Sequence, residues 1–128
     1  MKIEISNGEL LDKLSILEIK KKNITDSIKL VNIKNEFDEL EPLANILFND
    51  FSPKINDLYS KLSQINNELW VIEDEVREYE KNKNFNSKFI ELARSVYFTN
   101  DKRSVIKKEI NILTKSGLIE EKSYEDYK

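Results

Sequence analysis

The sequence predicts an all-α protein, an antiparallel bundle of about four helices, from three observations. Its 128 residues include only two glycines and two prolines, too few for the tight turns that β-hairpins need. Apolar residues recur at spacings of three and four along most of the chain, as in helices that bury one face. Charged residues make up 35% of the chain and can cover the opposite faces. We therefore expect one helical domain over residues 1–128, with a short C-terminal tail over 118–128.

Capping and turn residues delimit the first two helices. Ser6 and Glu9 match the capping box, so we expect a helix from there to about residue 23. Polar turn residues then predict a second helix from about Ser27. Pro42 lies inside its apolar pattern, and because proline donates no backbone hydrogen bond we expect a kink or a break near Glu41.

The last two helices are predicted to form a long antiparallel hairpin, over about 53–82 and 87–115. The first of them carries an unbroken apolar stripe, which indicates that it packs along a partner helix. A polar turn near Asn84 makes the next helix that partner, and we expect Gly117 to end it. The stripe consists of Ile55, Leu58, Leu62, Ile65, Leu69, Ile72, Val76 and Tyr79.

Composition argues against several classes of site. The chain has no Cys and no His, which removes disulfides, the usual zinc sites and His-dependent catalytic triads. We predict no metal and no cofactor. A net charge of −3 argues against nucleic-acid binding through a basic face. No apolar run approaches a signal peptide or the roughly 20 residues of a membrane span. We therefore expect a cytoplasmic protein that binds neither nucleic acid nor membrane.

Polar residues interrupt the apolar seam of the predicted hairpin. If its helices pair about Asn84, then Thr99, Asn100 and Arg103 fall at seam positions opposite residues 65–70. Polar groups buried without partners cost on the order of 1–3 kcal/mol each. These side chains therefore need protein partners, water or a ligand.

The arginines stand out against a background of lysine. The chain has 21 basic residues, and only Arg77, Arg94 and Arg103 are arginine. Arginine offers a planar, bidentate fork that lysine lacks, so these positions indicate a geometric demand: a partner that must be bound through two hydrogen bonds at once. That demand comes either from an internal carboxylate or from an anionic ligand. In the first case we expect interhelical ion pairs, Asp74 with Arg94 and Arg77 with Glu91.

In the second case nine residues beside the interruption form a candidate ligand-binding site. Arg94, Arg103 and Lys107 would neutralise an anionic ligand, and Tyr97 and Asn100 would orient it. The full set is Trp70, Glu73, Arg77, Arg94, Tyr97, Asn100, Asp101, Arg103 and Lys107.

Four stretches of the sequence form a distinctive set: ISNGELLDKLSILEIK (5–20), NNELWVIEDEVREYE (66–80), FIELARSVYFTNDKRSVIKKEIN (89–111) and EEKSY (120–124). Together they resemble a family of small bacterial and phage proteins that is classed as a domain of unknown function. The resemblance implies no established activity, substrate or cofactor. It suggests a sugar-nucleotide or glycan context, linked to surface-polysaccharide metabolism.

Two classes of function remain open. The heptad pattern favours a non-enzymatic binding, accessory or assembly module that self-associates or binds a helical protein partner. The alternative is a small enzyme or anion-binding protein with a pocket between the third and fourth helices, where Glu73 or Asp101 would act as general acid or base. Analogies with helical enzymes are poor. The first helix has no arginine, unlike that of a helical chorismate mutase, and the EExxE pairing of a MazG-type pyrophosphatase is missing.

Overall fold

Four helices account for nearly all of the regular structure. The computed structural model describes residues 1–127, and Lys128, the last residue of the predicted tail, lies outside them. Residues 1–127 contain no strand, which confirms the all-α prediction. The helices are α1 (Asn7–Asn23), α2 (Ser27–Phe51), α3 (Lys54–Lys81) and α4 (Ser87–Leu113).

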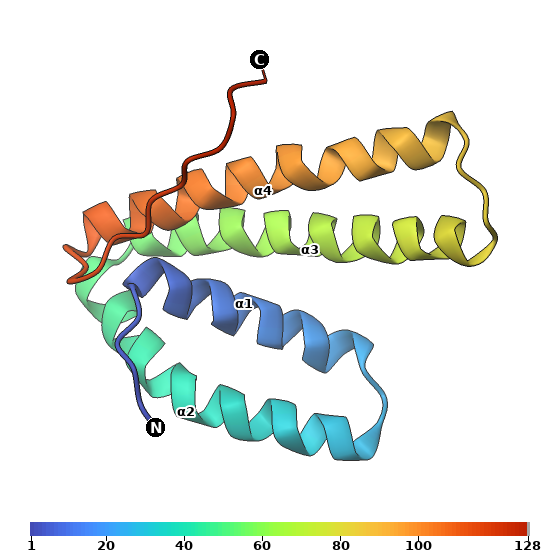
Figure 1. Ribbon diagram of the computed structural model, residues 1–128. Helices are drawn as coiled ribbons and strands as arrows, with labels where there is room; N and C mark the ends of the chain where they lie inside the picture. The colour runs from blue at the N-terminus through green and yellow to red at the C-terminus, as the bar shows by residue number, and fades with distance from the viewer. Residues whose placement is uncertain (128) are drawn as a thin grey trace.

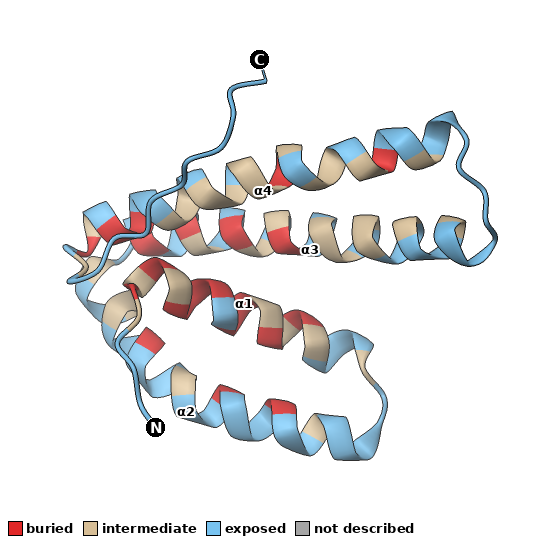
Figure 2. Ribbon diagram, viewed as in Figure 1, coloured by how far each residue is buried: buried red, intermediate tan, exposed pale blue. Residues whose placement is uncertain are grey.

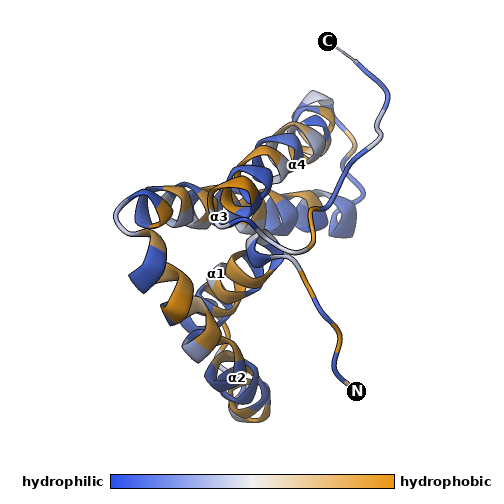
Figure 3. Cartoon of the chain, turned by 90° about the vertical axis from the view of Figure 1, so that its left-hand side faces the viewer, coloured by the Kyte–Doolittle hydropathy of each residue, from blue (hydrophilic) through white to orange (hydrophobic). Residues whose placement is uncertain are grey.

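The helices are arranged as two hairpins, α1 with α2 and α3 with α4 (Figure 1). An end view shows α1 between α2 and the α3–α4 pair (Figure 3). α1 contacts each of the other three helices. The predicted long hairpin is therefore present, and α1 is the element that joins it to the rest of the bundle.

Side-chain caps begin three of the helices. The Glu9 amide donates to Ser6 Oγ at 3.1 Å, and the Phe89 amide donates to Asn86 Oδ1 at 3.0 Å. α2 is capped in the same way by Asp26. The predicted capping box is only half formed, because the Glu9 carboxylate binds Lys107 of α4 instead of closing back on its own helix.

The kink or break expected near Glu41 is present as a bend without a break, whereas the prediction that Gly117 ends α4 is wrong. α2 continues through Pro42 to Phe51 without interruption, and Figure 1 shows it bending in its second half towards the start of α3. Gly117 does not end α4: the residue with positive φ is Lys115, at 51°. The Lys115 amide donates to the Ile112 carbonyl and the Ser116 amide to that of Asn111, the bonding pattern of a Schellman motif. The sequence suggests glycine here only because glycine is the commonest residue at that position.

The core lies at one end of the molecule (Figure 2). It joins the apolar faces of all four helices and includes Leu11, Leu17, Ile55 and Ile110. In α3 the buried residues stop at Asn66, and the later stripe residues of that helix are only half-buried. The distal half of the α3–α4 hairpin thus extends beyond the core.

None of the helices within residues 1–127 is long and apolar enough to cross a membrane.

Candidate functional site

The polar centre of the molecule is Asp12, which lies in the middle of α1 and is 1% exposed. Arg103 of α4 binds it with both arms of its fork: Nε donates to Oδ1 at 2.9 Å, and the terminal NH2 group donates to Oδ2. The hydrogen bonds to Asp12 raise the pKa of Arg103 above its ordinary value. The geometric demand indicated by Arg103 is therefore met by an internal carboxylate.

α3 contributes Asn66 to the same centre. Its amide nitrogen donates to Asp12 Oδ1 at 2.9 Å and to Ser15 Oγ at 2.6 Å. Ser15 donates in turn to the Asp12 carbonyl. Three helices therefore meet at one buried carboxylate whose oxygens have several donors, which is the condition under which a buried charge is tolerated.

Lys107 extends this ionic network towards the C-terminal tail. Its ammonium lies 2.6 Å from Glu9 Oε2, 3.8 Å from Asp12 Oδ2 and 3.3 Å from Glu120 Oε2. Glu120 also accepts from Lys122, and this hydrogen bond, with the charge of Lys107, lowers the pKa of the Glu120 carboxyl. The tail is thus tied to α4 and, through Lys107, to α1.

The start of α1 is joined to the end of α4 by neutral hydrogen bonds. Asn111 Oδ1 accepts from the Gly8 amide at 2.6 Å, and Ser116 Oγ accepts from the Asn7 amide at 3.0 Å. A Cβ atom at Gly8 would overlap the Lys107 carbonyl oxygen and lie 3.0 Å from Asn111 Oδ1. Glycine is therefore required at this position because the two helix backbones approach too closely for any side chain.

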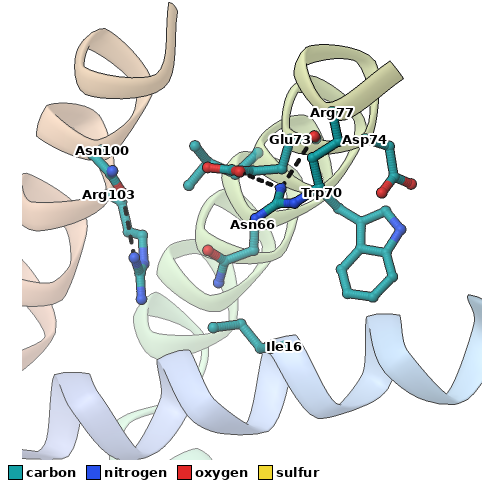
Figure 4. A pocket seen from close by; sticks show the side chains of 9 residues that line it. Ile16, Asn66, Trp70, Glu73, Asp74, Arg77, Asn100 and Arg103 are labelled. Carbon is teal, nitrogen blue, oxygen red and sulfur yellow. Dashed lines mark hydrogen bonds and ion pairs between the residues drawn. The ribbon is translucent and has the colours of Figure 1, made fainter. Parts of the chain in front are cut away.

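A surface cleft of about 500 Å³ opens beside this network, between α1, α3 and α4. Ile16, Leu69 and Trp70 contribute apolar surface to its lining. Figure 4 shows side chains of α3 and α4 pointing into the space above Ile16. The remaining residues are Asn66, Glu73, Asp74, Arg77, Asn100 and Arg103. The cleft therefore combines apolar surface with charges of both signs.

Five of the nine predicted site residues line this cleft: Trp70, Glu73, Arg77, Asn100 and Arg103. Arg94 is not among them. Its Nε lies 3.4 Å from the Tyr97 hydroxyl, and its guanidinium lies 5.6 Å from the centre of the Phe98 ring. Arg94 and Arg103 therefore do not converge on one ligand.

The predicted ion pairs across the α3–α4 hairpin are wrong. Arg77 binds Glu73 on its own helix, with NH1 2.5 Å from Oε2, and Glu91 pairs with Lys88. Residues four apart on a helix are neighbours, so Arg77 finds a carboxylate without reaching across. Asp74 lines the cleft.

Tyr97 and Asp101 belong to a separate cluster on α4. The Tyr127 hydroxyl of the tail donates to Asp101 Oδ2, and this hydrogen bond raises the pKa of Tyr127 to about 12. The Tyr97 and Tyr127 rings pack edge to face, with centroids 5.2 Å apart. The nine residues are thus divided between the cleft, the ionic network and this aromatic cluster.

The sequence interpretation did not assign a role to Asp12, Gly8 or Asn111. A signal was present for the first two. Gly8, Asp12 and Ser15 follow a helical spacing of four and three beside the apolar residues of α1, and small or polar residues in such a row indicate close or polar packing. Asn111 gave no comparable signal, because asparagine is common throughout the chain.

No cluster of three or more His, Cys, Asp or Glu side chains able to hold a metal ion occurs within residues 1–127. In the ionic network each carboxylate is paired with a cation: Asp12 with Arg103, Glu9 with Lys107, and Glu120 with Lys107 and Lys122. These pairs join α1, α4 and the C-terminal tail.

The fold and the site define this protein as an all-α bundle. A buried ionic network holds its helices together at one end, and the distal half of the α3–α4 hairpin extends beyond the core. The chain belongs to the family of unknown function DUF6165, which matches residues 1–127. No curated protein matches the chain, and no solved structure does so either.

Proposed function

We propose that this protein is a helical assembly module that self-associates through the distal half of the α3–α4 hairpin. One observation carries the proposal: this half extends beyond the core with its apolar stripe only half-buried. Helix faces of this kind are normally covered by another helix.

The cleft supports self-association in particular. Trp70 gives it the kind of large aromatic side chain that is enriched in protein interfaces. Asp74 and Arg77, of opposite charge, lie within one turn of α3 on the same cleft. Across a two-fold axis, Arg77 of each copy, while bound to its own Glu73, would also face Asp74 of the other copy, so that opposite charges meet at the proposed interface.

Trp70 provides the first test, because it is the only tryptophan in the chain. We expect its emission to move to shorter wavelength, and the average mass in sedimentation equilibrium to rise, as protein concentration is increased. A monomer at all concentrations, with unchanged emission, would refute self-association and direct attention to a helical segment of another protein.

Charge reversal sharpens this test. Asp74→Arg and Arg77→Asp are each expected to weaken association, and the double variant to restore it, because it re-creates opposite charges across the two-fold axis. Lys34→Glu, on the exposed face of α2, is the control and should associate like the wild type. A double variant as defective as either single variant would contradict the two-fold arrangement.

The alternative, an enzyme or anion-binding protein with its pocket between α3 and α4, has less support from this cleft. Glu73 and Asp74 line it together with Arg77 and Arg103, so an anion would meet as many carboxylates as guanidinium groups. Within the cleft, Arg77 is already paired with Glu73.

We also infer a cytoplasmic protein of bacterial or phage origin, as the composition and the family resemblance suggest. The resemblance adds a link to surface-polysaccharide metabolism, which makes nucleotide sugars worth including in a ligand screen. Cell fractionation with an antibody to the full chain tests the location, and recovery with the membrane pellet would contradict it.

A further inference from the structure

A second, smaller cavity of about 170 Å³ lies between α4 and the C-terminal tail. Three cations and three neutral polar side chains line it: Arg103, Lys107, Lys122, Asn100, Ser104 and Tyr124. No carboxylate is among the lining residues. The lining of this cavity therefore differs from that of the cleft, which includes Glu73 and Asp74.

The carboxylates that neutralise these cations also fix their positions. Asp12 binds Arg103 from the interior of the bundle, and Glu9 lies 2.6 Å from the Lys107 ammonium. Glu120 lies 2.8 Å from the Lys122 ammonium and 3.3 Å from that of Lys107. These carboxylates do not line the cavity. Cations held from behind in this way are pre-organised, so an anion can bind without first ordering the side chains.

A larger cavity of about 410 Å³ adjoins the basic one, and the two share Asn100 and Tyr124. Its other lining residues are Tyr97, Asp101 and Tyr127. The Tyr97 and Tyr127 rings stand at 73° to each other. This cavity offers aromatic faces together with a carboxylate that can accept hydrogen bonds.

We propose that the two cavities form one binding site for a phosphate monoester with a planar organic body, of the nucleoside monophosphate class. The phosphate would lie among Arg103, Lys107 and Lys122, because guanidinium and ammonium groups bind phosphate oxygens through charge-assisted hydrogen bonds. The base would lie against the tyrosine rings, which stack on the flat face of any base. Asp101 would accept from hydroxyl or amino groups of the ligand. This site lies outside the association surface proposed above, although Asn100 and Arg103 reach both.

Isothermal titration calorimetry of the full chain at low ionic strength tests the proposal with AMP, adenosine, inorganic phosphate and phosphocholine. AMP is expected to bind at least about tenfold more tightly than adenosine or phosphate alone, because only AMP fills both cavities. Tighter binding of phosphocholine than of AMP would overturn the assignment of a planar body. No binding of AMP would overturn the site as a whole.

Two variants on exposed side chains separate the two parts of the site without disturbing the buried network. Lys122→Ala is expected to weaken AMP binding about tenfold, whereas Lys108→Ala, which removes the same charge outside the basic cavity, should leave it unchanged. Tyr127→Ala should weaken binding of AMP but not of inorganic phosphate. Equal losses for Lys122→Ala and Lys108→Ala would show that only general charge attraction is at work, and would refute the site.

Discussion

The two ends of the α3–α4 hairpin are built differently. At the core end, α1 packs against both helices and inserts the buried Asp12 between them, with Arg103 and Asn66 as its partners. At the distal end, the hairpin has no helix over it, and its charged residues pair along their own helices, as Arg77 does with Glu73. The apolar stripe of α3 is therefore buried in the core in one half of the hairpin and only half-buried in the other.

The largest expected difference between the two ends comes from removing one carboxylate at each. Asp12→Ala removes the carboxylate that accepts from both Arg103 and Asn66, and loss of one partner of a buried ion pair costs about 3–5 kcal/mol. Glu73→Ala breaks the exposed pair with Arg77 and is expected to cost less than about 1 kcal/mol. Urea denaturation of both variants measures the free energies of unfolding.

The double variant Asp12→Leu/Arg103→Met separates ionic from packing effects, since replacing both charges by apolar groups should recover much of the loss. Similar destabilisation by Asp12→Ala and Glu73→Ala would contradict the distinction between the two ends.

Gly8→Ala tests how tightly α1 is held at the core end. The added methyl would overlap the Lys107 carbonyl oxygen, and because a backbone atom cannot rotate away we expect a loss of about 1–3 kcal/mol in stability. Gly117→Ala is the matched control, since a Cβ there meets no atom within 4 Å. Thermal unfolding monitored by circular dichroism measures both. An unchanged melting temperature for Gly8→Ala would mean that the helices are able to separate at little cost.

Glycine at the two left-handed positions gives the smallest expected effect. Lys83 and Lys115 have φ values of 52° and 51°, at the distal and core ends respectively. A side chain in this conformation costs about 1 kcal/mol relative to glycine. Lys115→Gly should therefore raise global stability by up to about that amount. Lys83→Gly should raise global stability less than Lys115→Gly does if the distal turn opens before the core unfolds. Hydrogen exchange at the two turns shows whether the distal turn opens first or both turns open together. Equal global gains would show that the ends unfold together.

The helices and the hairpin were predictable because their signals are local. Ser6 and Asn86 cap the helices that their sequence context predicts, and the stripe from Ile55 onwards identifies the long hairpin. Pro42 bends α2 without breaking it. The prediction that Gly117 ends α4 failed because it used the commonest residue of the left-handed position, which Lys115 occupies here.

The candidate site was predictable only in part. Arg103 indicated a partner that accepts two hydrogen bonds. That partner, Asp12, lies 91 positions away in the chain, and spacing patterns within one helix cannot identify a residue so distant in sequence. The interhelical pairs failed for the opposite reason, since Arg77 had a suitable carboxylate one turn away. The basic cavity was missed because Lys122 and Tyr124 come to α4 from the tail.

The bonds between α1 and the end of α4 also affect the order in which the chain folds. Asn7 and Ser116 are 109 positions apart, so during synthesis α1 leaves the ribosome long before its partners exist. Asp12 must remain hydrated until Arg103 has emerged, because a buried, unpaired carboxylate is strongly unfavourable. α3 and α4 follow each other in the chain and pack together, whereas docking of α1 on α4 joins residues 91 and 109 positions apart and therefore closes last. In chains arrested before residue 103, Asp12 should therefore remain without its arginine partner.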